Sequence, residues 1–85
     1  MPNNNWNMQL EIITPENKLF EGSVNSVQLP GLDGKFEILN NHAPIISILT
    51  KGNIRVIDTN NKTELFKING GVIEMQNNKV IVLAE

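Results

Sequence analysis

The chain has 85 residues, no cysteine and a formal net charge of −2, from seven basic and nine acidic side chains. A chain of this length makes one small domain that buries only about 60 to 65% of the surface exposed by its unfolded form. The composition excludes a disulfide framework and a thiolate metal site, and the lack of any basic stretch excludes a nucleic-acid-binding protein. We therefore expect a reducing compartment or a stabilising partner.

The sequence predicts a soluble, cytoplasmic chain. No apolar run approaches the 18 or so residues that a bilayer-spanning helix needs, and the opening MPNNN lacks the charged and apolar regions of a signal peptide. Residues 1–7 are expected to form a flexible segment and residues 8–85 a single domain, with no linker or repeat. Trp6, the sole tryptophan, is expected to fold over a sheet edge or to stay mobile, with a role as an interface anchor as the alternative.

Short apolar runs recur about every ten residues between clusters of Asn, Gly, Pro and Lys, which predicts an all-β sandwich or barrel. The first strand is expected at residues 8–13, where alternate apolar side chains share one face. Residues 18–22 and 23–30 are predicted as two further short strands. In the latter, Val24 is out of phase with the apolar residues after it, which predicts a bulge. Pro30 is expected to end that strand because it has no N–H to donate.

The next two apolar runs resemble a hairpin. Residues 45–49 and 54–58 are expected to pair around a turn at residues 51–53, with Ile54 and Val56 pointing inward.

The last third of the chain predicts three more strands. In residues 63–68, Leu65 and either Phe66 or Ile68 are expected to be buried. The final pair, at 72–75 and 79–85, is expected to be joined through Gln76-Asn77-Asn78, because asparagine tolerates the positive φ of a tight hairpin.

No set of residues meets the requirements of catalysis or metal binding. His42 is the only base that titrates near neutrality and there is no cysteine, so a nucleophilic triad is not expected. The stretch GLDGK at residues 31–35 lacks the spacing and following helix of a phosphate loop and is interpreted as a turn. Asp33 and Glu37 with one histidine give too few metal ligands. We predict no catalytic, cofactor-binding or metal-binding residue, and a backbone hydrogen bond for the His42 ring.

Two other functions stay open at this point. Lys79 follows a predicted hairpin turn, as in a lipoyl-like or biotinyl-like carrier domain, although Glu74-Met75-Gln76 precedes it at the wrong spacing. A free-standing peptide- or sugar-binding sandwich would need an exposed aromatic platform, and three phenylalanines with one tryptophan barely fill a core.

With the all-β prediction in place, the segment LPGLDGKFEILNNHAP (residues 29–44) followed by IISILTKGNIRV resembles the signature of the epsilon subunit of F-type ATP synthases. The start MQLEIITPENKLFEG and the end GGVIEMQNNKVIVLAE are also similar to that family, so the resemblance covers residues 8–85. The positions that match the family's signature are Pro30, Gly31, Gly34, Phe36, Leu39, His42, Ala43, Pro44, Leu49 and Gly52.

The resemblance implies an antiparallel β-sandwich of two sheets that acts as a non-catalytic rotor subunit. Such a subunit binds the gamma subunit and the c-ring, and it couples ion-driven rotation to ATP synthesis on the cytoplasmic side of a bacterial membrane, which it reaches only through the complex. By analogy, Leu32, Asp33, Gly34 and Lys35 are expected to contact the c-ring, with Asp33 facing a ring arginine. Asn41, His42, Ala43 and Pro44 are expected to contact gamma.

This sequence departs from the family pattern in two places. Family members often have Pro-Gly immediately before His-Ala-Pro, where this chain has Asn40-Asn41. Family members usually continue into a two-helix domain that inhibits ATP hydrolysis and in some binds ATP, whereas this sequence stops at Glu85. The expectation is a subunit without an inhibitory arm and without a bound nucleotide.

Overall fold

Every regular element of the computed structural model, which describes residues 7–85, is a β-strand. No helix that could span a membrane occurs in that range, and the expectation for Trp6 falls outside it. The all-β prediction is confirmed. The strands are β1 (Met8–Ile13), β2 (Lys18–Gly31), β3 (Gly34–Leu39), β4 (Ile45–Leu49), β5 (Gly52–Asp58), β6 (Thr63–Ile68), β7 (Gly71–Gln76) and β8 (Lys79–Ala84).

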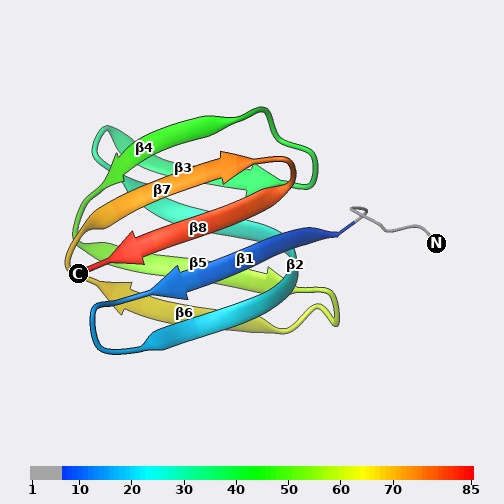
Figure 1. Cartoon of the computed structure of the whole chain (residues 1–85), viewed down its shortest axis with the longest axis horizontal. Helices are drawn as coiled ribbons and strands as arrows, with labels where there is room; N and C mark the ends of the chain where they lie inside the picture. The colour runs from blue at the N-terminus through cyan, green and yellow to red at the C-terminus, as the bar shows by residue number, and fades with distance from the viewer. Residues whose placement is uncertain (1–6) are drawn as a thin grey trace.

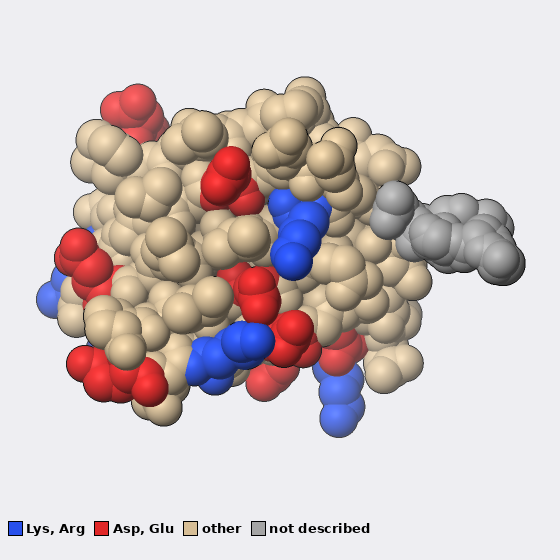
Figure 2. Space-filling model, viewed as in Figure 1, with Lys and Arg blue, Asp and Glu red and all other residues tan. Residues whose placement is uncertain are grey.

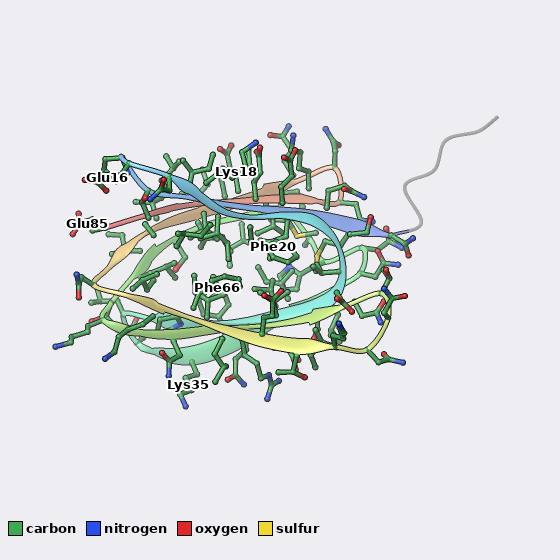
Figure 3. The ribbon with its side chains drawn as sticks, turned by 90° about the horizontal axis from the view of Figure 1, so that it is seen from below. Glu16, Lys18, Phe20, Lys35, Phe66 and Glu85 are labelled. Carbon is green, nitrogen blue, oxygen red and sulfur yellow. The ribbon has the colours of Figure 1, made fainter. Side chains whose placement is uncertain are left out.

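The strands form two layers that face each other across the core (Figures 1 and 3). One layer, here called the β8 layer, has the order β4-β7-β8-β1 and continues into the first half of β2. The other, the β5 layer, contains β3, the second half of β2, β5 and β6. All of these pairings are antiparallel except β1 with β8, which is parallel.

The strand β2 belongs to both layers, and the prediction of two separate strands at residues 18–22 and 23–30 is wrong. The predicted bulge is confirmed: the register with β5 shifts between Val24 and Ser26. It bends the strand from one layer into the other without interrupting it. Pro30 does not end the strand either, because it still pairs with Lys35, and its carbonyl accepts a hydrogen bond from the Thr50 N–H at 2.8 Å.

The predicted hairpin between residues 45–49 and 54–58 is also wrong. β4 pairs with β7, whereas β5 pairs with β2 and β6, so the chain crosses between the layers at residues 50–51. Ile54 and Val56 do point inward. Alternation correctly predicts the buried face of this strand, but it carries no information about which strand lies alongside.

Aliphatic side chains from both layers fill the core. Phe20 and Phe66 meet edge to face between the layers, with ring centroids 5.8 Å apart (Figure 3). The prediction that Leu65 is buried is wrong, since Leu65 is 62% exposed opposite Arg55, while Ile68 is buried. The buried apolar residues are Met8, Leu10, Ile12, Val24, Val27, Leu29, Ile38, Leu49, Ile54, Val56, Ile68, Ile73, Met75, Val80, Val82 and Ala84.

Two of the tight turns depend on positive φ angles. Asn77 and Asn78 have φ of 54° and 60°, as predicted for the β7–β8 hairpin. Gly71 begins β7 at a φ of 152°, and a Cβ there would lie only 2.3 Å from the Leu83 carbonyl oxygen. The backbones of β7 and β8 can therefore approach this closely only with glycine at position 71.

We expect Gly71→Ala to destabilise the fold by about 2 kcal/mol or more, because the added methyl group meets backbone and the φ angle is unfavourable. Gly22→Ala is the matched control, since the nearest atom to its Cβ would be the Phe20 ring at 3.5 Å. The control should change stability by less than about 0.5 kcal/mol. Urea unfolding of both variants measures the difference, and equal midpoints would contradict the steric argument.

Candidate interaction surface

The two segments predicted as contact sites lie at opposite ends of the sandwich. Leu32 and Asp33 form the turn before β3, and Gly34 and Lys35 are the first residues of β3. Residues 41–44 follow the end of the same strand. A strand of this length spans roughly 20 Å at about 3.3 Å per residue. In Figure 1 the turn lies at the left, where the chain also ends, and the loop lies at the right. The structure therefore does not bring the predicted contact residues together.

The β2–β3 turn, residues 32–35, is tight and presents its side chains outward. A Cβ on Gly31 would lie 2.7 Å from the Gly34 carbonyl oxygen, and Gly34 has a φ of 127°. The Leu32 N–H donates to the Ile48 carbonyl at 3.1 Å, which ties the turn to β4. Leu32 is 64% exposed, and the exposed Asp33 carboxylate has no ion-pair partner among the described residues. Both side chains are available to another molecule.

The β3–β4 loop, residues 40–44, is held by a side chain that is distant in sequence. Asn78 is buried, and its side-chain nitrogen donates to Asn40 Oδ1 at 2.7 Å. Its side-chain oxygen accepts from the Asn41 N–H, also at 2.7 Å. Sequence reasoning assigned Asn78 only to the hairpin turn and missed this bridge. The Asn40-Asn41 pair thus supplies hydrogen-bonding groups that the Asn78 amide uses.

His42 makes the backbone hydrogen bond that the sequence predicted. Its Nδ1 lies 2.7 Å from the Ala43 carbonyl oxygen, so Nδ1 carries the proton that is donated. The His42 N–H donates to the Leu39 carbonyl at 3.1 Å, which closes the turn after β3. Asn41, Ala43 and His42 are all exposed.

A row of apolar side chains crosses the outer face of the β8 layer, at the end of the sandwich where β8 and the chain end. Ile13 lies opposite Leu83, Leu83 opposite Val72, and Val72 opposite Ile48. Leu32 adjoins Ile48 through the hydrogen bond described above. Four of these five side chains are exposed, and the half-buried Ile13 is the fifth.

Ile46, two residues before Ile48 on β4, extends this row and is 74% exposed. We call Leu32, Ile46, Ile48, Val72 and Leu83 the apolar face. Figure 2 views this side of the molecule: acidic and basic side chains lie over its middle and lower part and at its left rim, with an uncharged area between them. An open depression on this surface is lined by Leu32, Ile48, Val72 and Leu83 of the apolar face together with Ile13.

The part of the same face formed by β1 and the first half of β2 carries an ion-pair cluster. The Lys18 ammonium lies 3.0 Å from a Glu11 carboxylate oxygen and 2.9 Å from one of Glu21. The hydrogen bond from Lys18 holds the pKa of Glu11 below its ordinary value, and the hydrogen bonds to Glu21 and Glu11 raise the pKa of Lys18. Nothing in the pattern of the sequence indicated this cluster.

The described part of the chain holds no cluster of metal-ligating side chains. Within residues 7–85, no three His, Asp or Glu side chains lie close enough together to hold a metal ion. Lys79 is exposed at the start of β8, beside Gln9 and Gln76 in the strand register.

Comparison with known proteins identifies one family. The family model of the β-sandwich domain of the ATP synthase delta/epsilon chain matches residues 7–85. The ATP synthase epsilon chain of Chlorobium limicola is 42% identical over 77 residues, which cover 91% of this chain and 88% of that protein. The epsilon chain of Campylobacter curvus is 41% identical over 78 residues, which cover 92% of this chain but only 60% of that protein.

Solved structures agree on the fold. A chain in the cryo-EM structure of the Euglena gracilis mitochondrial ATP synthase, with OSCP, F1 and the c-ring, superposes with a TM-score of 0.87 at 16% identity and matches 98% of this chain. A chain in the Tetrahymena thermophila mitochondrial ATP synthase central stalk and c-ring superposes with a TM-score of 0.74, also at 16% identity. This chain spans 53% and 63% of the length of those two chains.

We expect Asn78→Gly to destabilise the protein by about 1 to 3 kcal/mol, because it keeps the positive φ but removes the side-chain amide that accepts from the Asn41 N–H and donates to Asn40 Oδ1. Asn77→Gly is the matched control, since Asn77 has a similar φ and an exposed side chain. Thermal unfolding should separate the two variants. Hydrogen exchange at the Asn41 N–H should accelerate only in Asn78→Gly, and equal exchange in both would contradict the bridge.

The Lys18 cluster predicts a pH-dependent contribution to stability. The pKa of Glu11 is lowered in the folded protein, so its contribution is present above the unfolded pKa and is lost as pH falls. Lys18→Met should therefore lower the unfolding temperature at pH 7, and the difference from wild type should begin to shrink as pH falls through about 4.3, the ordinary pKa of glutamate, and should disappear at still lower pH. The difference should also shrink in high salt. Lys62→Met, at an exposed lysine without an ion pair among the described residues, should show no such pH dependence.

Proposed function

Because this chain belongs to the β-sandwich family of ATP synthase delta/epsilon chains, we propose that it is a central-stalk subunit that binds the gamma subunit and the c-ring. The family match over residues 7–85 is the observation that carries this proposal. In this role the chain is a non-catalytic subunit of a membrane-associated complex. The family match also removes the reason for considering a carrier domain or a free-standing binding module.

The fold suits a part that transmits torque. Rotation with a shaft requires contacts that do not yield, and a broad contact on a rigid domain loses little conformational entropy on binding. Both layers are continuous ladders joined through β2. The β3–β4 loop is held by Asn78, so the end of the sandwich that carries it is also ordered.

We assign the c-ring contact to the β2–β3 turn. Leu32 and Asp33 project from the end of the sandwich, and the glycines on either side permit the tight turn. An exposed carboxylate at this position suits a basic side chain on the ring loops, because complementary charges orient two surfaces as they meet. The loop residues Asn41, His42, Ala43 and Pro44 remain our assignment for part of the gamma contact. A ring contact at this end would place the sandwich on the cytoplasmic side of a bacterial membrane.

The subunit assignment is tested by pull-down of the tagged chain from membranes of its own cells at moderate salt. Recovery of gamma together with c-ring and catalytic subunits is the expected result. Recovery of neither gamma nor c would overturn the proposed function.

The ring contact is tested by Asp33→Lys, which should reduce recovery of the c-ring at least fivefold at low salt, because it replaces attraction by repulsion. The difference in c-ring recovery between Asp33→Lys and wild type should become smaller as the salt concentration rises, since exposed charges are screened. Glu64→Lys makes the same change of charge at an exposed position on β6, in the other layer, and should leave recovery unchanged. If Asp33→Lys and wild type recover the ring equally at both salt concentrations, the pairing is wrong while the subunit assignment stands.

A further inference from the structure

Three lysines gather at one end of the β5 layer. Lys35 is the second residue of β3 and lies opposite Pro30 on β2. Lys67 is near the end of β6 and lies opposite Asn53 on β5. Lys51 directly precedes β5. All three therefore lie at the end of the β5 layer that carries the β2–β3 turn, and we call them the basic corner.

The charges of the basic corner are not neutralised within the described part of the protein. All three side chains are exposed, and none has an ion-pair partner among residues 7–85. Arg55, on the same layer, differs because it is paired with Glu37. In Figure 3 Lys35 projects outward from the β5 layer, away from the core. The three ammonium groups are therefore available to an anionic partner.

Two carboxylates at the same end of the sandwich belong to the other layer. Glu16 lies in the turn between β1 and β2, and Glu85 follows β8. Figure 3 shows both on the side opposite to Lys35. Asp33 lies in the β2–β3 turn, which is assigned above to the ring contact. Although the whole chain has a net charge of −2, its β5-layer side is thus positive at this end.

We propose that the basic corner binds the anionic phosphate headgroups of the membrane lipids around the c-ring. This proposal rests on the central-stalk function proposed above, because a ring contact at the β2–β3 turn brings this end of the sandwich to the membrane surface. Lys35 directly follows that turn, so the ring contact and the lipid contact would lie side by side. The complex still delivers the chain to the membrane, and the lysines add a direct contact there.

The basic corner suits a diffuse anionic surface better than a defined contact with another protein. Lysine presents a compact, strongly hydrated charge on a flexible stem, whereas arginine and aromatic side chains dominate well-defined protein interfaces. The strands β3, β2, β5 and β6 lie side by side. At about 4.8 Å between neighbouring strands, Lys35 and Lys67 are roughly 14 Å apart. One carboxylate cannot meet both, while a layer of headgroups can meet each lysine separately.

The expected contact is modest and depends on the rest of the complex. A lysine near an anionic bilayer strengthens association roughly fivefold, so three lysines strengthen it on the order of a hundredfold. This effect does not hold the isolated chain at a membrane. A chain already held on the ring experiences the lipids at high local concentration and gains the full effect. Because the attraction acts between exposed charges, it should weaken in salt.

The test measures how long the chain stays on the assembled enzyme in membranes of different charge. The complete complex, carrying a fluorescently labelled copy of the chain, is reconstituted into vesicles of phosphatidylcholine alone or of phosphatidylcholine mixed with phosphatidylglycerol. Release is followed at low salt after addition of excess unlabelled chain. We expect the wild-type chain to dissociate roughly tenfold or more slowly from the anionic vesicles. The combined variant Lys35→Gln/Lys51→Gln/Lys67→Gln should dissociate from both kinds of vesicle at the same rate.

The matched control is Lys62→Gln/Lys79→Gln. Both lysines are exposed, have no ion-pair partner among the described residues, and lie at the opposite end of the sandwich, in the β5–β6 loop and at the start of β8 (Figure 1). This variant should keep the wild-type difference between the two kinds of vesicle. High salt should abolish that difference in wild type and control alike.

The other outcomes are distinguishable. Equal dissociation of the wild-type chain from neutral and anionic vesicles would overturn the lipid contact and leave the subunit function intact. Faster release of the combined variant by the same factor from both vesicles would also overturn it, and would assign the basic corner to a protein surface. Slower release from neutral vesicles when inorganic phosphate is added at constant ionic strength would assign it to a free anion. If the wild-type chain does not assemble on the complex, the proposed function fails as well.

Discussion

The bend in β2 is the feature on which the rest of the structure depends. One 14-residue strand pairs with β1 in the first layer and with β3 and β5 in the second, and the register shift between Val24 and Ser26 lets it turn without a break. Because the same ladder continues through both layers, the two sheets cannot slide apart without breaking backbone hydrogen bonds. The bend also determines which side chains face inward, since it brings Val24 and Val27 into the same core despite their mismatched phase.

This construction explains how so small a domain can serve as a mechanical part. A chain of 85 residues has a limited core and is expected to be only marginally stable by itself. Binding to a partner adds stability by mass action, so membership of a permanent complex compensates for the small core. The surfaces offered to partners lie on strands or on loops that are hydrogen-bonded to strands. Few backbone segments therefore lose conformational freedom when a partner binds.

The candidate surfaces differ in how far they can be recognised from the sequence. The turn at residues 32–35 could be predicted, because Gly31, Asp33 and Gly34 are residue types that favour tight turns. The support of the β3–β4 loop could not, since Asn78 lies 37 residues after Asn41 and looks like an ordinary hairpin asparagine. The apolar face was equally hidden: Ile48, Val72 and Leu83 come from three separate runs, and each alone is an unremarkable outward residue.

The sequence by itself determined the class of fold, the buried face of most strands, the hairpin at Asn77 and Asn78, and the family. These properties are local, because alternation and positive φ preferences are set by each residue and its nearest neighbours. Only the tertiary structure decided that β4 pairs with β7, that β1 and β8 run parallel, and that Leu65 is exposed while Phe66 turns toward Phe20. A period of two is the same whichever strand lies alongside, so the choice of neighbour follows from packing the whole core and not from any single run of residues.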